Sequence, residues 1–306
     1  MNRGMMSREG REGVYHRCQG KIFRGGVALR GCETSHRMKW VGVVAVVALL
    51  TTLPGGYLRA SAQSASAPGW AVIIENDSYA GRHRELPVAY INSTRMLRVL
   101  THRGWPVDHV LLLRDSLDPQ TLNTALGWLA ARVRPGDVAL FYVAGEYQFF
   151  ARDLHWSATV PALWRRVPTM RRVMIVETCF AERLADATRG IPGLALAAVA
   201  RDEWDWWGLR DNGPVMRGAP FTYFLANALN EQAQDAPLDF DSAFVQASAD
   251  VQAYFHDVIV TTPGALDAFH AISAYPERLA IFPNPQLVEE AETTGSSPTP
   301  PPDRRR

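Results

Sequence analysis

The chain has 306 residues, of which 47% are apolar, 21% charged and 10% aromatic. This composition excludes a disordered or fibrous protein and supplies enough apolar residues for a sizeable core. Of the 32 Lys and Arg residues, 10 lie in residues 1–62 together with 3 of the 31 Asp and Glu residues, so residues 63–306 hold 22 against 28, a net charge of −6. A net negative charge gives no indication of a nucleic-acid surface, and we expect no nucleic-acid partner.

The N-terminal segment has the layout of a signal peptide. Met38-Lys39 precedes a 14-residue apolar run, Trp40 to Leu53, and the small residues Ala60-Ser61-Ala62 follow. A helix of that length rises about 21 Å, short of the roughly 30 Å hydrocarbon core of a bilayer. We therefore expect residues 38–62 to be a signal peptide, cleaved after Ala62, and the protein to be exported to the periplasm or the extracellular space. The alternative is a retained membrane anchor, the one case in which we expect contact with a membrane.

Residues 1–37 have no hydrophobic periodicity, which indicates an unstructured segment or an overlong start. At the other end, residues 286–306 are mostly polar and rich in proline, and we expect a disordered tail. The folded domain is therefore predicted over residues 69–285.

Short apolar runs alternate with helical patterns between these limits, which is typical of βαβ units. Buried strands are predicted at residues 70–74, 110–113, 137–143, 172–177 and 194–199. Helices are predicted over residues 88–103, from Asp118-Pro119 to near Pro135-Gly136, and over residues 221–229 and 240–255. The fold class is therefore α/β, with helices around a mainly parallel sheet.

Cys179 directly follows the predicted strand 172–177, at the sheet edge where ligands bind in such folds. A helix starting there would stabilise a thiolate, although a free cysteine is also often a small buried apolar residue. Cys18 and Cys32 lie before the expected cleavage site, so no intrachain disulfide framework is expected after it. No metal cluster, phosphate-binding loop or dinucleotide fingerprint occurs in the sequence, and we expect no cofactor.

Four segments in this order resemble the caspase-like cysteine peptidases, the superfamily of caspases, metacaspases and, more distantly, legumains. They are Leu86-Pro87-Val88-Ala89, Phe141-Tyr142-Val143-Ala144-Gly145, Val176-Glu177-Thr178-Cys179 and Phe221-Thr222-Tyr223-Phe224-Leu225. The resemblance covers roughly Gly69 to Leu229. It implies a caspase-like sandwich of helices around the sheet, and a cysteine–histidine dyad.

The resemblance places the nucleophile at Cys179, but the position of the dyad histidine is occupied by Glu146, and Tyr147 replaces the glycine that follows it. An ionised carboxylate raises the pKa of a nearby thiol and cannot protonate a leaving amine. His83 and His155, in loops after the first and third strands, are the possible substitute bases.

Two loops are candidates for substrate binding. Arg82 or Arg84, after the first strand, resembles the position from which the family presents a basic residue to the substrate. After the fifth strand come Asp202, Trp204, Trp206 and Trp207. Three tryptophans within four residues are difficult to bury together, so we expect this loop to form one wall of a binding groove.

The leading hypothesis is an exported pseudo-peptidase that binds peptide or protein segments. Two alternatives remain: an active cysteine endopeptidase that uses Cys179 with a displaced base, and an exported adaptor or structural domain in which Cys179 is merely buried.

Overall fold

The computed structural model describes residues 69–79, 86, 88–115, 117–209, 215–269 and 283–288. Its strands form one sheet in the order β2-β1-β3-β4-β5-β6. They are β1 (Gly69–Asn76), β2 (Val110–Arg114), β3 (Val138–Gly145), β4 (Arg172–Glu177), β5 (Leu194–Ala197) and β6 (Gln286–Val288). All neighbouring strands are parallel except β5 and β6, which are antiparallel. The predicted, mainly parallel sheet is confirmed.

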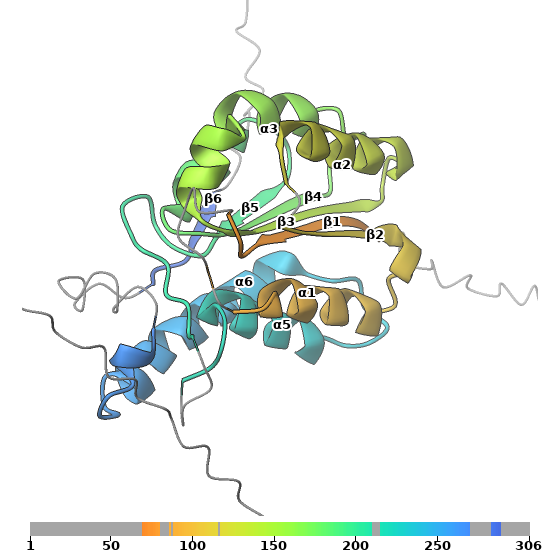
Figure 1. Ribbon diagram of the computed structural model, residues 1–306. Coiled ribbons are helices and arrows are strands. Elements are labelled where there is room, and N and C mark those ends of the chain that lie inside the picture. Colours follow the sequence, from red (N-terminus) through yellow and green to blue (C-terminus); the bar gives the residue numbers. More distant parts are fainter. Residues whose placement is uncertain are drawn as a thin grey trace, which may run out of the picture. The chain divides into compact units, whose positions relative to one another are not determined.

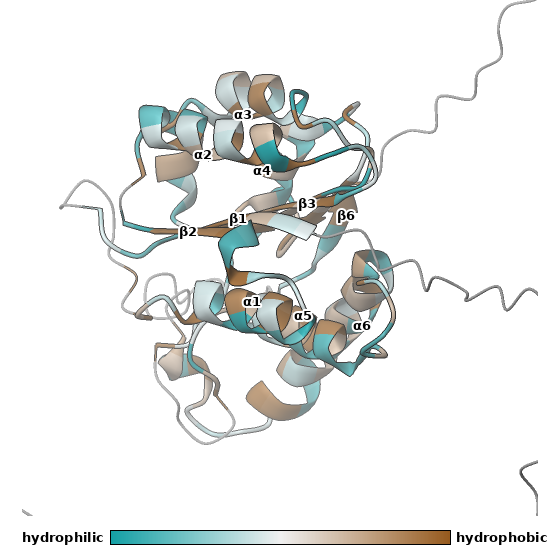
Figure 2. Ribbon diagram, turned by 90° about the vertical axis from the view of Figure 1, so that its right-hand side faces the viewer, coloured by the Kyte–Doolittle hydropathy of each residue, from teal (hydrophilic) through white to brown (hydrophobic). Residues whose placement is uncertain are grey.

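Helices cover both faces of this sheet (Figures 1 and 2), with α1, α5 and α6 on one face and α2, α3 and α4 on the other. The α-helices are α1 (Ile91–His102), α2 (Pro119–Arg132), α3 (Trp156–Trp164), α4 (Ala181–Ala185), α5 (Pro220–Glu231) and α6 (Phe240–Ala253). Shorter turns are η1 (Val107–His109), η2 (Phe149–Asp153), η3 (Asp186–Thr188), η4 (Tyr254–Ile259) and η5 (Leu266–Ala268). The expected sandwich of helices around a sheet is therefore present.

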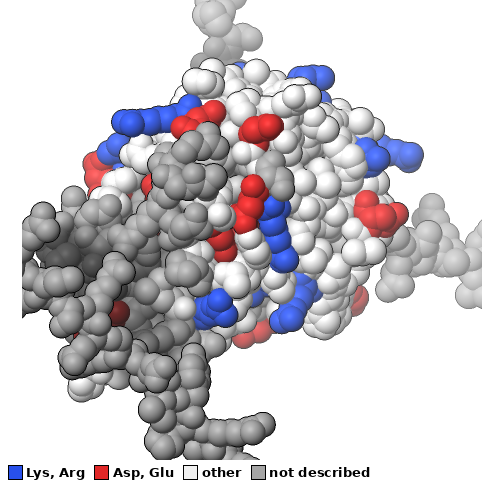
Figure 3. Space-filling model, viewed as in Figure 1, with Lys and Arg blue, Asp and Glu red and all other residues white. Residues whose placement is uncertain are grey.

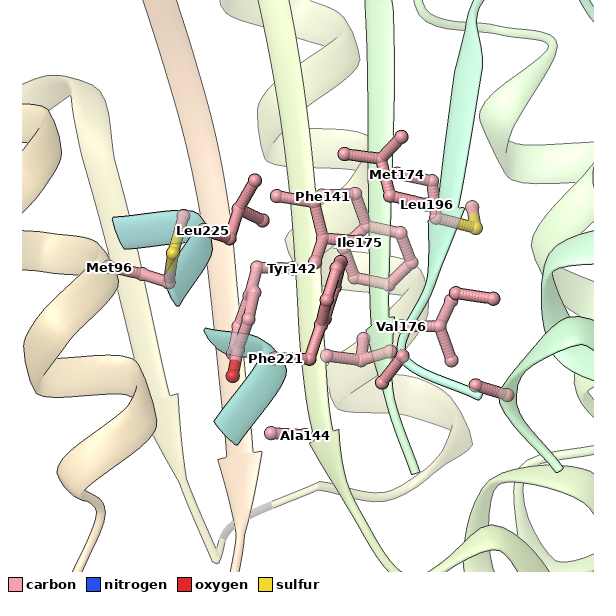
Figure 4. Close-up of a cluster of buried hydrophobic side chains, with 14 of the residues drawn as sticks. Met96, Phe141, Tyr142, Ala144, Met174, Ile175, Val176, Leu196, Phe221 and Leu225 are labelled. Atoms are coloured by element: carbon pink, nitrogen blue, oxygen red, sulfur yellow. The ribbon is translucent and has the colours of Figure 1, made fainter. Parts of the chain in front are cut away.

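The core lies on both sides of the central strands, as a sheet covered on both faces requires. On β3, Phe141 and Tyr142 point to opposite faces and are fully buried. The ring of Phe141 stacks on Trp156 of α3 with centroids 5.8 Å apart. Tyr142 lies toward Phe221 of α5 (Figure 4). Strand β3 thus packs against helices on both faces of the sheet. This packing fixes the position of the carboxyl end of β3.

Local sequence signals explain most element boundaries. Asp118 caps α2, its carboxylate accepting a hydrogen bond from Thr121 N at 2.6 Å. Helix α1 begins at Ile91, three residues later than predicted, because Ala89 and Tyr90 have left-handed backbone conformations with φ of 55° and 56°. An α-helix cannot include residues in that conformation.

Three predictions differ from the structure. The second strand, expected to be buried, is only partly buried, because β2 is an outer strand of the sheet. Residues 286–288, assigned to the disordered tail, form β6, which pairs with β5 through Leu196 and Leu287. Helix α3 was not predicted, since it carries an internal proline, Pro161, and is largely apolar around its circumference.

Among the described residues, no helix has the length and apolar character needed to cross a membrane.

Candidate active site

Strands β1, β3 and β4 end at the same edge of the sheet. Their register pairs Asn76 with Gly145, and Ala144 with Glu177. Glu146 follows Gly145 directly, and Cys179 lies two residues beyond Glu177. The two residues therefore lie side by side after neighbouring parallel strands, as the sequence predicts.

Cys179 is half-buried and lies among carboxylates. Burial raises the pKa of its thiol well above the usual range, and the negative charges of Asp205 and then Glu146 raise the pKa further. A hydrogen bond from the Asp205 backbone N–H partly offsets these effects. The helix that follows, α4, has only five residues, so the helix dipole that the sequence suggested as a support for the thiolate is short. The surroundings of Cys179 thus favour the neutral thiol.

Glu146 is held at its backbone by Tyr79. The Glu146 N–H donates to the Tyr79 hydroxyl at 2.5 Å, and that hydroxyl donates to the carbonyl oxygen of Asn76. A side chain on Gly145 would clash here, since its Cβ would lie 2.6 Å from the Tyr79 oxygen, and its φ of 151° also favours glycine. The Glu146 side chain accepts a long hydrogen bond from Gln148 N at 3.3 Å. Hydrogen bonds through the Tyr79 hydroxyl therefore hold the backbone of the loop that carries Glu146.

Two further carboxyl groups, those of Glu177 and Asp205, are buried near this edge of the sheet. Glu177 ends β4, is fully buried, and accepts a hydrogen bond from Thr222 N of α5 at 2.8 Å and another from the Thr222 hydroxyl. Asp205 is also buried and accepts from Trp206 N at 2.8 Å and from Trp207 Nε1. Burial, followed by the charge of Asp205, raises the pKa of Glu177 well above its usual range, and burial raises the pKa of Asp205 to about 6.

The burial of Glu177 and Asp205 was not predicted from the sequence, which places Glu177 in the segment that resembles the family motif and Asp205 in the loop expected to form a groove wall. A signal was present for Glu177, because an acidic residue ends an otherwise apolar buried strand. Asp205 gave no such signal, because its burial depends on how the loop after β5 packs against the sheet. Asp205 and Glu146 are the two carboxyl groups whose charges act on the Cys179 thiol.

Three half-buried aromatic rings from three loops line the same edge, and we call them the edge aromatics: Tyr147, Phe180 and Trp204. The centroid of Phe180 lies 5.2 Å from that of Tyr147 and 5.1 Å from that of Trp204. The guanidinium of Arg183 lies over the Phe180 ring at 5.0 Å. Since Phe180 follows Cys179 in the chain, this cluster offers apolar contact area close to the thiol.

The tryptophans of the loop after β5 divide between the surface and the core. Trp206 is fully buried and packs edge-on against Phe255 and Phe269, with centroids 5.0 and 5.8 Å away. Trp207 is 3% exposed, and its indole N–H donates to Asp205. The prediction that both line a binding groove is wrong. Their burial relies on residues more than 45 positions later in the chain, which local sequence does not reveal.

The other predicted site residues lie in different surroundings. Asp202 is exposed and forms an ion pair with Arg183. His155 is exposed at the start of α3, with a φ of 49°, and none of its described contacts reaches Cys179. Arg82, His83 and Arg84 lie outside the described residues. In the part of the chain that the structure describes, no cluster of His, Cys, Asp and Glu has the arrangement of a metal site.

Comparison with known proteins bears on the fold. No family model and no curated protein matches the sequence. Among solved structures, the chain is similar to the crystal structure of caspase-1 from Spodoptera frugiperda, with 12% identity and a TM-score of 0.48 over 74% of this chain and 88% of that one. A likeness at this level concerns the chain path alone and identifies neither a catalytic residue nor a substrate.

Proposed function

We propose that this protein is a caspase-like pseudo-peptidase, which keeps the nucleophile position but lacks the base, and which binds peptide or protein segments at the carboxyl edge of its sheet. The observation that carries the proposal is that the Cys179 thiol lies near enough to the carboxyl groups of Asp205 and Glu146 for both charges to raise its pKa, and that Glu146 follows the strand next to the one that leads to Cys179. The thiolate is the nucleophilic form of cysteine, and both neighbours disfavour it.

Glu146 does not replace a histidine chemically. Its charge raises the pKa of the thiol, whereas a histidine at this position could both accept and deliver a proton. A positioned acid–base group is typically worth about 10²–10⁴ in rate, and this contribution is missing. Peptide hydrolysis by this chain should therefore be negligible.

Binding does not need the base. The edge aromatics supply three half-buried rings from separate loops, and amphipathic rings of this kind are enriched in sites that hold peptide segments. Tyr147 stands where the family has glycine, and its ring packs against Phe180, the residue that follows Cys179, so it adds bulk close to where a reacting peptide bond would lie.

The test is a hydrolysis assay with a mixed peptide library, comparing wild type with Cys179→Ala. We expect no Cys179-dependent cleavage. Cleavage by the wild type that is lost in Cys179→Ala, and also lost in His83→Ala or His155→Ala, would replace the proposal by an active endopeptidase with a displaced base. If Cys179 also resists alkylation in the folded protein at every pH, the alternative of an adaptor or structural domain with a buried Cys179 is favoured.

Binding is tested separately by calorimetric titration with peptides selected from the same library. Trp204→Ala should abolish binding, because Trp204 contributes the half-buried ring at the end of the edge aromatics. An exposed residue far from this edge, Val107 on η1, provides the matched control as Val107→Ala. Equal binding by both variants would show that the edge aromatics are not the peptide-binding surface.

We also propose that the mature protein is exported and begins at Gln63, on the basis of the signal-peptide layout alone. N-terminal sequencing of secreted or periplasmic material tests this. An intact leader in the membrane fraction would favour an anchor.

A further inference from the structure

Two loops meet at the amino edge of the sheet, opposite the edge that carries Cys179. One joins α2 to β3 over residues 133–137, and the other joins α3 to β4 over residues 165–171. They are bound together by hydrogen bonds from Thr169 Oγ1 to Asp137 O at 2.7 Å and from Arg171 Nη1 to Gly136 O at 3.1 Å. Backbone pairing of Ala139 N with Arg171 O at 3.0 Å extends this connection. The loops therefore form one continuous surface.

This surface, which we call the amino-edge patch, carries five exposed arginines at or beside the two loops: Arg132, Arg134, Arg165, Arg166 and Arg171. None of the five forms an ion pair with a residue that the structure describes. The acidic residue within the loops, Asp137, is buried, and its carboxylate accepts a hydrogen bond from the backbone N–H of Arg134 at 2.8 Å. The patch is therefore strongly positive in a domain whose net charge is negative. Figure 3 shows basic side chains, with an acidic one below them, on the right-hand rim, which lies on the side of the amino ends in Figure 1.

An apolar tip lies among these charges. Met170 is 67% exposed, and the exposed Pro135 and Pro168 lie in the same loops. Met170 borders two hollows of about 400 and 370 Å³, and Arg171 lines both of them. Across the second hollow lies Asp239, whose carboxylate is already bound to Ser242 N at 3.1 Å as the cap of α6. Met170 therefore lies between two hollows and is surrounded by arginine side chains.

We propose that the amino-edge patch docks on an anionic phospholipid bilayer, with the arginines at the phosphate groups and Met170 entering the interface between headgroups and acyl chains. An apolar tip ringed by cations fits a surface that is charged outside and apolar within. A nucleic acid would need rings for stacking or polar side chains for base edges, and Trp164, the aromatic residue next to the second loop, is buried.

Docking in this orientation has a consequence for the opposite edge. The parallel strands run from the amino-edge patch to the edge that carries Cys179. A bilayer at the amino ends therefore leaves Cys179 and the edge aromatics turned away from the membrane. The proposal does not depend on whether Cys179 reacts.

The test is sedimentation of the purified protein with phosphatidylcholine vesicles, with and without phosphatidylglycerol. We expect binding only to vesicles that contain phosphatidylglycerol. Arg165→Gln/Arg166→Gln should weaken binding about 25-fold, because each arginine near an anionic surface contributes about fivefold. The matched control is Arg98→Gln/Arg152→Gln, which removes the same charge from exposed arginines elsewhere. Circular dichroism establishes that both variants are folded.

Three results would overturn the proposal. Equal weakening by the two double variants would indicate a general charge effect, and no weakening by either would assign any binding to another part of the chain. The third involves Met170→Ser, which should weaken vesicle binding. If Met170→Ser binds like wild type and duplex DNA or heparin competes through Arg165 and Arg166, the patch recognises soluble polyanions instead of a bilayer.

Discussion

The buried carboxyl groups of Glu177 and Asp205 lie close enough for the charge of Asp205 to raise the pKa of Glu177, in addition to the larger effect of burial. Both effects disfavour the ionised form, so the neutral form of Glu177 is favoured. Thr222 N and the Thr222 hydroxyl both donate to one oxygen of Glu177. A neutral acid is therefore built into the end of β4, where the charge of Asp205 acts on the thiol.

Buried carboxyl groups with raised pKa values, Asp205 and Asp77 among them, determine how the stability of the fold changes with pH. Burial raises the pKa of Asp205 to about 6, and burial together with Glu75 and Asp115 raises the pKa of Asp77 to about 8. A carboxyl group whose pKa is raised by folding stabilises the folded state fully below its unfolded pKa, and that stabilisation is lost as pH rises through the folded pKa. The melting temperature should therefore fall as pH rises from about 5 to about 8.

Glu177→Gln tests the part of this profile that the pair contributes. The amide is neutral at every pH and keeps an acceptor toward Thr222, so the melting temperature should fall less steeply with pH than in the wild type. Asp241→Asn, which alters an exposed carboxylate on α6, serves as the control and should follow the wild-type curve. A wild-type protein that becomes more stable toward pH 8 would contradict the assignment.

The reactivity of Cys179 should increase when its acidic neighbours are neutralised. Asp205→Asn and Glu146→Gln each remove a negative charge that raises the pKa of the thiol, so each should increase the rate of alkylation by iodoacetamide at neutral pH by several-fold. Peptide mapping by mass spectrometry isolates Cys179 from Cys18 and Cys32. Asp202→Asn, at an exposed position on the same loop, is the control. Unchanged rates in both test variants would mean that burial alone sets the pKa.

A histidine at position 146 should also increase the reactivity of Cys179. Glu146→His places a group that can be cationic beside the thiol and should lower the pKa of Cys179. Combining it with Tyr147→Gly removes a bulky ring that can block substrate even when a base is present. We expect the double variant to gain measurable hydrolysis over wild type. A lowered pKa without any hydrolysis would indicate that the groove does not present a peptide bond to the thiol.

The two kinds of tryptophan in the loop after β5 should respond differently to truncation. Trp206→Ala removes a fully buried ring packed on Phe255 and Phe269, so it should lower the free energy of unfolding by about 3–5 kcal/mol. Trp204→Ala, at a half-buried ring, should lower it by only about 1 kcal/mol. Urea denaturation followed by circular dichroism measures both. Similar losses would mean that Trp204 also belongs to the core.

Local patterns were sufficient for much of the sheet. Strand β4 was predicted with its observed limits, because a run of β-branched residues ends at a turn. Strand β6 was missed, since three residues form a strand only through pairing with β5, far away in the chain. The burial of β2 was overestimated because an apolar run reads the same at the outside of a sheet as at its centre.

Some features of the candidate site could likewise be predicted from the sequence, and others could not. The neighbouring positions of Cys179 and Glu146 followed from two strands and a crossover long enough to return parallel. The burial of Trp206 did not follow, because it depends on Phe255 of η4 and on Phe269, which follows η5. Local sequence reports the order of elements, and only packing decides which side of a loop faces inward.

The backbone at Phe180 carries a further implication. Its φ of 53° is one that glycine adopts freely and that costs a residue with a Cβ roughly 1–2 kcal/mol. The Phe180 N–H nevertheless donates to Glu203 O at 2.8 Å, which holds the turn closed directly after Cys179. Glycine alone would adopt this conformation without that cost. The peptide directly after Cys179 therefore keeps an unfavourable backbone conformation that contacts such as the Glu203 bond maintain, and loss of that bond would favour a different backbone conformation beside the thiol.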